Sequence, residues 1–358
     1  MVNHYLTKSI SRRVCRRAAR EMATLPLVNL TEEEALRVDN QWKGFAGEYT
    51  PLFHRLYKTF QRFDERWVSE EVYAPAILRA LNPRHEALTL SHKALLPLRF
   101  SAIPQPRFIV LYHDGKFLSP TFERLTRQDV EASLLSAASF IIKPTHNTSR
   151  GHGIKRVENP TRETVRQLMK EYKHGFIAQE VIRQSAQTAQ FNPDSVNTFR
   201  ITTLFLNGRA SLCNILFRCG QGNTCVDNGG AGGLMVGVDE QGRFMPYAFD
   251  KYYQRHTESR NGVKFEGVVI PQLSSTVAQA LEWHRQYMPL CGIVGWDIAL
   301  NENNEPLMVE MNLRFPGIVF EQICTDKPFF GERTDEVIEY AKSHQPSLGM
   351  LVAERYNL

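Results

Sequence analysis

The most informative stretch of the sequence is Gly295-Trp-Asp-Ile-Ala-Leu-Asn-Glu-Asn-Asn-Glu-Pro-Leu-Met-Val-Glu-Met-Asn312. It has the pattern of a β-hairpin, because apolar and β-branched residues flank a polar turn at 301–306. A turn centred on residues 303–304 places Asp297 opposite Glu310, and strand alternation puts Asn312 on the same face as Glu310. Opposed residues in such a pair have Cβ atoms roughly 4.5–5.5 Å apart. Two carboxylates and an amide oxygen therefore converge on one patch.

Two interpretations of this patch are open from the segment alone. Like charges directly opposite each other destabilise a hairpin unless something neutralises them. A divalent cation would do so, and a set of oxygen ligands suits Mg²⁺. The alternative is a solvated hairpin whose carboxylates point to water.

Composition limits the class of protein. The chain has 358 residues, of which 42% are hydrophobic, enough for a large core and two or more lobes. The net charge of +5 suits an anionic ligand such as a nucleotide as well as it suits nucleic acid. The arginine-rich stretch near the N-terminus is short and no interleaved aromatic and basic residues follow it, so we expect no nucleic-acid partner.

The cysteines and the apolar pattern predict a cytoplasmic protein. The six cysteines are scattered without a Cys-x-x-Cys pair, which indicates reduced thiols. A zinc site at Cys213, Cys219 and Cys225 is disfavoured because the spacing matches no common pattern. The chain has no long apolar run and no apolar core of a signal peptide.

Residues 1–85 are predicted to form a helical accessory domain. Aromatic and aliphatic residues recur there every three or four positions, as expected for core packing, and Pro51 should kink or split the helical run. Near the N-terminus, Arg12, Arg16 and Arg20 fall on one helical face. This face is either simply solvated or a peripheral contact with an anionic membrane.

From about residue 86 the pattern alternates between strands and helices. Strands are predicted at 108–112, 140–143, 175–182, 198–206 and 210–217, and helices at 127–138, 161–172, 275–288 and 335–342. The mixture predicts an α+β fold with antiparallel sheets, and no internal repeat is present.

A phosphate-binding signal follows one of these strands. Lys143 ends a strand and precedes the polar loop His146–Gly153, whose Gly151 and Gly153 allow backbone N–H groups to approach phosphates. A lysine in that position can hold a phosphate oxygen as a point charge. A surface hairpin with a flexible tip explains the same residues, and Lys93 alone is a still weaker signal.

The order of these features resembles the ATP-grasp superfamily over roughly residues 86–330. Lys93, Lys143 with its loop, Gln179-Glu-Val-Ile182, Arg200, and then Asp297 with Glu310-x-Asn312 follow in the order that this superfamily shows. The resemblance implies the ATP-grasp fold, in which two α+β lobes hold ATP between antiparallel sheets. The regions would be an N-terminal helical domain (1–85), an N-lobe with the phosphate-covering loop (86–175) and a C-lobe with the metal hairpin (176–358).

The same resemblance implies roles for individual residues. Lys93, Lys143, Gly151 and Gly153 would hold ATP phosphates, and Gln179, Glu180, Val181 and Ile182 would form the adenine-binding hinge. Asp297, Glu310 and Asn312 would ligate Mg²⁺. Catalysis would involve Arg200, Lys143 and Arg314.

Two further segments resemble one branch of this superfamily. Ser195–Thr202 and the glycine-rich segment Asp227–Gly233 look like sugar-transfer-associated ATP-grasp proteins, which are found beside polysaccharide genes. The residues implied for the substrate are Asn197, Arg200, Asp227 and Asn228. One position departs from the pattern of D-alanine ligases, since Gly295 stands where those enzymes carry a phosphate-binding arginine. Arg200 or Arg314 would have to replace it.

These resemblances imply an ATP-dependent carboxylate–amine ligase that works through an acyl phosphate, with ATP and Mg²⁺ as cofactors. Its partners would be a small-molecule carboxylate and an amine, the latter on a sugar or a lipid-linked glycan. Two alternatives stay open: a kinase of the same fold that phosphorylates a hydroxyl, and a non-catalytic nucleotide-binding protein.

Overall fold

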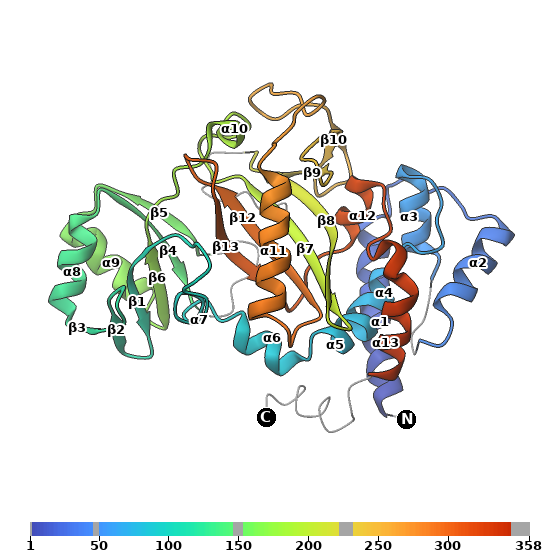
Figure 1. The fold of residues 1–358 in the computed structure, drawn as a ribbon, viewed down its shortest axis with the longest axis horizontal. Coiled ribbons are helices and arrows are strands. Elements are labelled where there is room, and N and C mark those ends of the chain that lie inside the picture. Colours follow the sequence, from blue (N-terminus) through green and yellow to red (C-terminus); the bar gives the residue numbers. More distant parts are fainter. Residues whose placement is uncertain (1, 46–49, 146–152, 222–231, 345–358) are drawn as a thin grey trace.

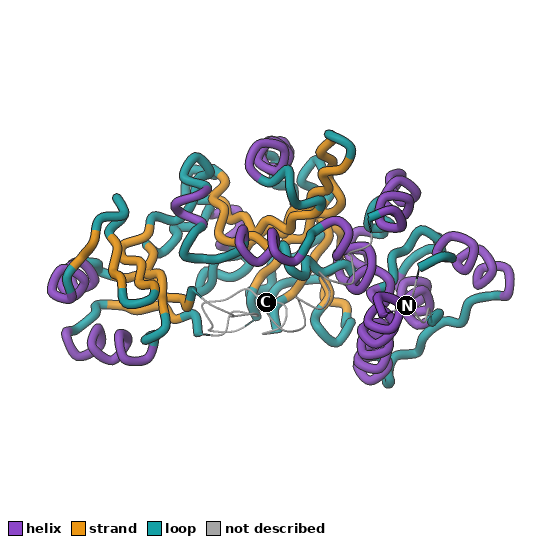
Figure 2. The backbone as a smooth tube through the Cα atoms, turned by 90° about the horizontal axis from the view of Figure 1, so that it is seen from below, coloured by secondary structure: helices purple, strands orange, loops and turns teal. Residues whose placement is uncertain are grey.

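The fold consists of two antiparallel sheets with flanking helices, joined to a group of N-terminal helices (Figure 1). The computed structural model describes residues 2–45, 50–145, 153–221 and 232–344. Figure 2 shows the two sheets as separate layers side by side, with the N-terminal helices beyond the second sheet. The expected α+β fold with antiparallel sheets is confirmed.

The first sheet has the strand order β3-β2-β1-β6-β4-β5, and all its pairings are antiparallel. Helices α8 and α9 pack on it through a shared apolar cluster that includes Val130, Val165 and Phe140. Thr126 and Thr161 cap the two helices with their side chains. The elements are β1 (Phe108–His113), β2 (Lys116–Leu118), β3 (Arg124–Leu125), α8 (Arg127–Ser136), β4 (Ser139–Pro144), β5 (Lys155–Glu158), α9 (Arg162–Glu171) and β6 (Gly175–Gln179).

The second sheet has the order β11-β10-β9-β8-β7-β12-β13, again antiparallel throughout. Helix α11 (Leu273–Tyr287) contacts β7 and β8, while α12 (Val319–Thr325) contacts β8, β9 and β10. The short helix α10 (Ala186–Ala189) lies between the two sheets in the sequence. The strands are β7 (Thr198–Leu206), β8 (Arg209–Cys219), β9 (Leu234–Val238), β10 (Phe244–Phe249), β11 (Arg255–His256), β12 (Ile293–Leu300) and β13 (Pro306–Asn312).

The predicted N-terminal helices are present, and Pro51 splits the run as expected because it stands at the start of α3. The chain passes through a π-helical turn at Tyr73–Ile77 that contains Pro75. The helices are α1 (Val2–Glu21), α2 (Glu32–Trp42), α3 (Leu52–Phe60), α4 (Glu70–Val72), α5 (Leu78–Leu81), α6 (Arg84–Leu90) and α7 (Leu96–Arg99). At the other end of the chain, a short 3₁₀ turn (Gly331–Arg333) leads into α13 (Thr334–Ser343).

The N-terminal helices share their apolar core with the second sheet. One cluster joins Trp42 and Tyr73 to Leu204 and Ile293, and it extends to α13. A second cluster joins helices α1 and α3 to β8 and α12, for example Tyr57 to Leu216 and Ile323. Burial of this apolar surface fixes the helices against the sheet.

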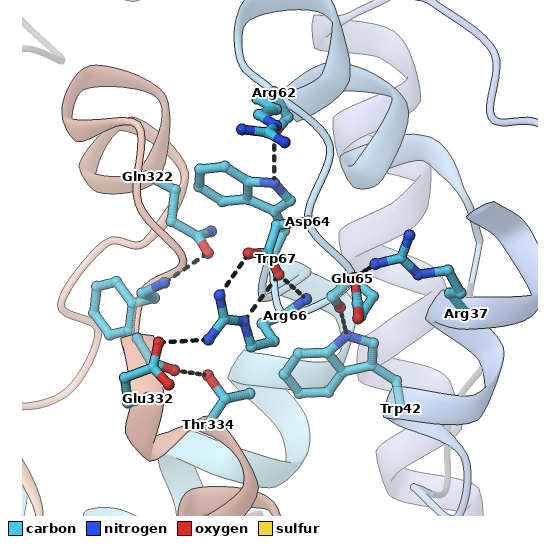
Figure 3. Close-up of polar contacts among 12 residues, drawn as sticks. Arg37, Trp42, Arg62, Asp64, Glu65, Arg66, Trp67, Gln322, Glu332 and Thr334 are labelled. Atoms are coloured by element: carbon cyan, nitrogen blue, oxygen red, sulfur yellow. Dashed lines mark hydrogen bonds and ion pairs between the residues drawn. The ribbon is translucent and has the colours of Figure 1, made fainter.

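Polar contacts reinforce this packing around residues 61–68 (Figure 3). Gln322 of α12 accepts a hydrogen bond from the Val68 N–H at 2.9 Å and donates one to its carbonyl at 3.0 Å. Arg66 donates to Asp64 at 2.8 Å and to Glu332 at 2.8 Å. The N-terminal segment is therefore hydrogen-bonded directly to α12 and to the turn before α13.

Helix α1 has the predicted amphipathic character. Ser11, Val14 and Ala18 are buried, whereas its basic residues Arg12, Arg13, Arg16 and Arg20 are exposed. Within the described part of the chain, no helix is long and apolar enough to cross a bilayer.

A buried carboxyl group in α4 predicts how stability depends on pH. Burial raises the pKa of Glu71 to about 8 from an ordinary value near 4.5, and the neighbouring Glu70 adds to this shift. Between these two pH values the folded state keeps a proton that the unfolded state releases. The free energy of unfolding should therefore fall as pH rises through this window.

We expect the Glu71→Gln variant to lose that dependence, because its amide does not ionise. The difference in melting temperature between variant and wild type should grow in favour of the variant from pH 5 to pH 9. The expected change is on the order of 10 °C, at ~1.4 kcal/mol per pH unit and ~2–4 °C per kcal/mol. Glu33→Gln, at an exposed position in α2, is the control. A difference that stays constant across this range would contradict the assignment.

Candidate functional site

The hairpin β12–β13 forms the centre of the site, and its register is the predicted one. Asp297 lies opposite Glu310, as expected. The turn itself starts one position earlier than expected, since the Asn304 N–H donates to the Asn301 carbonyl at 2.8 Å and Leu300 pairs with Pro306. A bulge at Val309, between the pairs Asp297–Glu310 and Ile298–Met308, restores the register.

Asp297 is buried and bonded to side chains from three strands. Arg200 of β7 donates to it through Nε and, at 3.1 Å, through Nη2. Arg218 of β8 lies 3.1 Å away, and the Asn312 amide donates at 3.0 Å. Burial raises the pKa of Asp297, but Arg200 and Arg218 outweigh that effect and the net shift is downward. The carboxylate is therefore held in its ionised form.

The side chain of Arg200 explains why residue 295 is a glycine. A Cβ atom at position 295 would lie 3.2 Å from Arg200 Cδ and 3.3 Å from Pro316 Cβ. Such distances are tighter than ordinary van der Waals contacts, so Arg200 occupies the space that a side chain on residue 295 would need. Of the two arginines considered as replacements for the missing one, Arg200 lies over Gly295, while Arg314 is exposed in the loop after β13.

Two lysines from the first half of the chain approach Glu310. Lys93 lies in the turn between α6 and α7, and its Nζ is 3.3 Å from Glu310 Oε1. Lys143 is buried in β4, opposite Ile177 of β6. Burial lowers the pKa of Lys143 to about 8; Glu310 opposes this shift and Lys93 adds to it. The two lysines and Glu310 are thus within electrostatic reach of one another.

The predicted hinge follows β6 and links the two sheets. Gln179 ends the strand with a buried side chain that donates to the Pro106 carbonyl at 3.1 Å. The predicted strand ends here, so Glu180, Val181 and Ile182 form an irregular and partly exposed connection. The Glu180 N–H donates to the Arg107 carbonyl at 2.9 Å, so a ligand at this segment would have to use its other backbone groups.

The loop after Lys143 is only partly described. Gly153 has a φ of +76°, and a Cβ atom there would lie 2.9 Å from Pro144 Cγ, so this position requires glycine. Gly151 lies outside the described residues, as do Asp227 and Asn228. Their predicted roles in binding phosphate and substrate stay predictions.

Asn197 is placed in the protein interior. Its amide Nδ2 donates to Gln184 Oε1 at 2.9 Å and to the carbonyls of Thr188 and Asn192 at 2.8 Å each. These contacts hold the segment that leads into β7, and thereby the start of the strand that carries Arg200.

Two charged residues at the site were not identified from the sequence. Arg218 contacts Asp297 from β8, and Glu321 lies fully buried in α12. Burial raises the pKa of Glu321, and Arg200 and Arg218 oppose the shift, so this carboxyl group is close enough to sense both arginines. A single arginine within the apolar run Ile215–Cys219 is the signal that identifies position 218 as unusual.

The hairpin carries oxygen groups of the kind that bind magnesium, and in this structure the Asp297 oxygens accept from Arg200, Arg218 and Asn312. No three Asp, Glu, His or Cys side chains gather anywhere in the described residues, so a protein-only cage is absent from this part of the chain. Mg²⁺ is usually held by one or two carboxylates together with water and substrate phosphates. Asp297 and Glu310 supply two carboxylates on one face, with the Asn312 amide beside them.

A double-mutant cycle tests the contact between Gly295 and Arg200. In a strand interior, glycine to alanine normally stabilises by about 0.5–1 kcal/mol. We expect Gly295→Ala instead to destabilise by about 1–2 kcal/mol, because the new methyl group crowds Arg200 and Pro316. Urea denaturation should show that this cost shrinks in an Arg200→Ala background. Additive costs would mean that Arg200 does not occupy the space over Gly295.

The chain is similar to one described protein family and to solved structures of low sequence identity. A family model described as sugar-transfer associated ATP-grasp matches residues 75–337. A comparison with curated proteins gave no match. Similar solved structures include the ATP-grasp ligase PsnB complexed with a minimal precursor, at 14% identity and a TM-score of 0.41 over 72% of this chain and 62% of that one.

Two further structures are similar at the same level. D-alanyl-alanine synthetase A from Vibrio cholerae has 12% identity and a TM-score of 0.42, over 72% of this chain and 65% of that one. D-cycloserine synthetase DcsG has 12% identity and a TM-score of 0.44, over 74% of each chain. The matches to PsnB and to the Vibrio protein span less than two thirds of those chains, and such distant similarities assign no activity. The family match covers most of the sequence and includes the site, and the chain belongs to the sugar-transfer-associated ATP-grasp family.

Proposed function

We propose that this protein is an ATP-dependent carboxylate–amine ligase. The observation that carries the proposal is the meeting of residues from both sheets at one hairpin. Lys93 contacts Glu310 at 3.3 Å, Lys143 lies within their electrostatic reach, and Arg200 binds Asp297. Lysines, an arginine and paired carboxylates are the groups that phosphoryl transfer requires.

The residues present suit ATP and Mg²⁺ in defined places. Asp297, Glu310 and Asn312 would hold magnesium, which when bound neutralises phosphate charge. Lys93 and Lys143 would hold phosphate oxygens as point charges. The backbone of Glu180–Ile182 would bind adenine, and the segment 146–153 would cover the phosphates and exclude water.

The proposed chemistry has two steps. A carboxylate oxygen of the first substrate forms a bond to the γ-phosphorus of ATP, and the bond from that phosphorus to the ADP oxygen breaks. The amine then attacks the carbonyl carbon of the acyl phosphate, the carbon–oxygen bond to phosphate breaks, and the amine nitrogen releases a proton. Arg200 would stabilise the negative charge that develops on the reacting oxygens. Arg314, exposed beside the hairpin, is a second candidate for that role.

The substrates that we propose follow from the family alone. An amino acid or another carboxylate would be joined to an amino group during glycan or surface-polysaccharide biosynthesis, with the amine on a sugar or a lipid-linked glycan. Asp227 and Asn228 would lie on the acceptor side, while the buried Asn197 would support the site by holding the segment before β7. We expect the enzyme to act in the cytoplasm. The exposed arginines of α1 suit a peripheral contact with an anionic membrane, which sedimentation with anionic vesicles would test.

A kinase that phosphorylates a hydroxyl is the second candidate, because the same lysines and metal ligands serve both reactions. A non-catalytic nucleotide-binding protein is the third. The two carboxylates and the amide at the hairpin support catalysis over this third function, because binding alone needs fewer metal ligands.

The three functions are separated by one assay. The protein is incubated with ATP, Mg²⁺, a panel of carboxylates and hydroxylamine, and hydroxamate and ADP are measured. A ligase gives hydroxamate because hydroxylamine traps the acyl phosphate. ADP and a stable phospho-product without hydroxamate would identify a kinase, and nucleotide binding without ADP would identify the non-catalytic function.

The Glu310→Gln variant should lose at least about 100-fold in turnover, or ~2.7 kcal/mol of transition-state stabilisation. The Glu310 side chain is one third exposed, so the fold should survive. Glu302→Gln, on the exposed turn of the same hairpin, is the matched control and should keep wild-type activity. Undiminished turnover in the Glu310 variant would remove this residue from the metal site.

A further inference from the structure

The side chain of Asn82 occupies the position of a strand at one edge of β12. Strand β12 pairs with β13 only as far as Gly295 and Asn312. Two residues before Gly295, the Ile293 N–H donates to Asn82 Oδ1 at 2.9 Å, and Asn82 Nδ2 donates to the Ile293 carbonyl at 2.7 Å. One side-chain amide therefore satisfies both backbone groups of a residue that β13 does not pair with.

The same amide also bonds to the chain that leaves β13. Asn82 Nδ2 donates to the Leu313 carbonyl at 2.8 Å. Leu313 directly follows Asn312, the last paired residue of the strand and one of the residues predicted to ligate Mg²⁺. Asn82 thus connects the beginning of β12 to the end of β13, at the end of the hairpin opposite its turn.

The backbone around Asn82 is itself held in place. Asn82 follows α5, is only 4% exposed, and precedes Pro83, which disfavours a helical conformation at residue 82. The Gly292 N–H donates to the Leu81 carbonyl at 2.7 Å. A Cβ atom at Gly292 would lie 2.8 Å from Leu81 Cδ2, so the two segments are in direct contact. The amide of Asn82 is therefore presented from a fixed position.

Beyond Leu313 the chain crosses back over β12. A Cβ atom at Gly295 would lie 3.3 Å from Pro316 Cβ and 3.5 Å from Asn312 Cβ. The bond to the Leu313 carbonyl lies between Asn312 on one side and Arg314 on the other. Loss of this bond would free both neighbours to shift.

We propose that Asn82 is a positioning residue for the magnesium site, which holds Asn312 and the segment 313–316 where metal binding requires them. Asn82 acts through the backbone of Leu313 and does not itself ligate the ion. Residues that orient metal ligands typically change metal affinity or activity by about 10–100-fold when they are replaced. This inference rests on the proposed use of ATP and Mg²⁺ and adds a residue to that site.

The Asn82→Leu variant tests this role, because leucine branches at the same atom as asparagine but has no donor or acceptor. The affinity for ADP is measured by titration calorimetry, once with excess Mg²⁺ and once with EDTA. We expect the magnesium complex of ADP to bind about tenfold more weakly to the variant than to the wild type, because Asn312 is no longer held. ADP in EDTA should bind equally to both, because the lysines and the hinge proposed for ADP lie in other segments.

Asn192→Leu is the matched control. Asn192 is buried and has the same pattern of contacts, since its Nδ2 donates to Ser195 Oγ and to the Gly220 carbonyl at 3.0 Å each and its Oδ1 accepts from the Asp194 N–H at 2.9 Å. These contacts lie outside the hairpin β12–β13. The control should lose stability and keep both affinities.

A smaller change keeps the inference testable if Asn82→Leu does not fold. Asn82→Ser leaves room for water to reach the two carbonyls, and it should show a smaller loss of the same kind. Equal losses of ADP affinity with Mg²⁺ and with EDTA, or no loss in either, would overturn the role of Asn82 and leave the proposed function standing. A wild-type protein that binds no ADP, or binds it equally well with Mg²⁺ and with EDTA, would overturn the proposed magnesium site itself.

Discussion

A buried carboxylate held between two guanidinium groups is the interaction on which the site depends. Asp297 cannot be buried alone, because an ion without a partner in a protein interior loses several kcal/mol of hydration. Removing one partner of a buried ion pair typically destabilises a protein by about 3–5 kcal/mol. Arg200 provides that partnership from β7, the strand beside β12, and Arg218 from β8, the next strand of the sheet. The hairpin β12–β13 and the arginines therefore form one electrostatic unit, and a ligand that changes the charge at Asp297 acts on both.

The opposite face of β12 holds this unit in place. The Trp296 indole N–H donates to the Thr203 hydroxyl at 2.9 Å, and that hydroxyl lies 2.7 Å from Nδ1 of His284. The other ring nitrogen of His284 is 2.8 Å from the Cys291 carbonyl, so it carries the proton. Burial lowers the pKa of His284 to about 4, which keeps the ring neutral, with one donor and one acceptor. A one-residue slip of β12 would break this chain and turn Asp297 away from the arginines.

Two bulges explain how much of the site could be predicted from the sequence. Periodicity located most of the helices and strands of the fold, and hairpin counting placed Asp297 opposite Glu310, although only the bulge at Val309 made the count correct. In the hairpin of β7 and β8, the same counting from the Asn-Gly turn at 207–208 would pair Thr198 with Phe217. An extra residue at Cys213 shifts that register and puts Arg218 there instead. A bulge leaves no reliable mark in the sequence, so Arg218 could not be placed by pattern. Glu321 was missed for another reason, since its position depends on how α12 packs.

The packing of α12 also connects the N-terminal helices to the charged residues around Asp297. Gln322 makes two hydrogen bonds to the backbone of Val68, and Gln61 donates to the Ile323 carbonyl, so the N-terminal segment fixes α12 along one side. The residue before Gln322 is Glu321, a buried carboxyl group whose pKa is raised by burial and lowered in turn by Arg200 and Arg218. Because the backbone position of Glu321 follows that of α12, the contacts at Val68 help to fix where this carboxyl group lies. The N-terminal helices are thus part of the structure that sets the charge balance at Asp297, in addition to any role in binding an acceptor or a membrane.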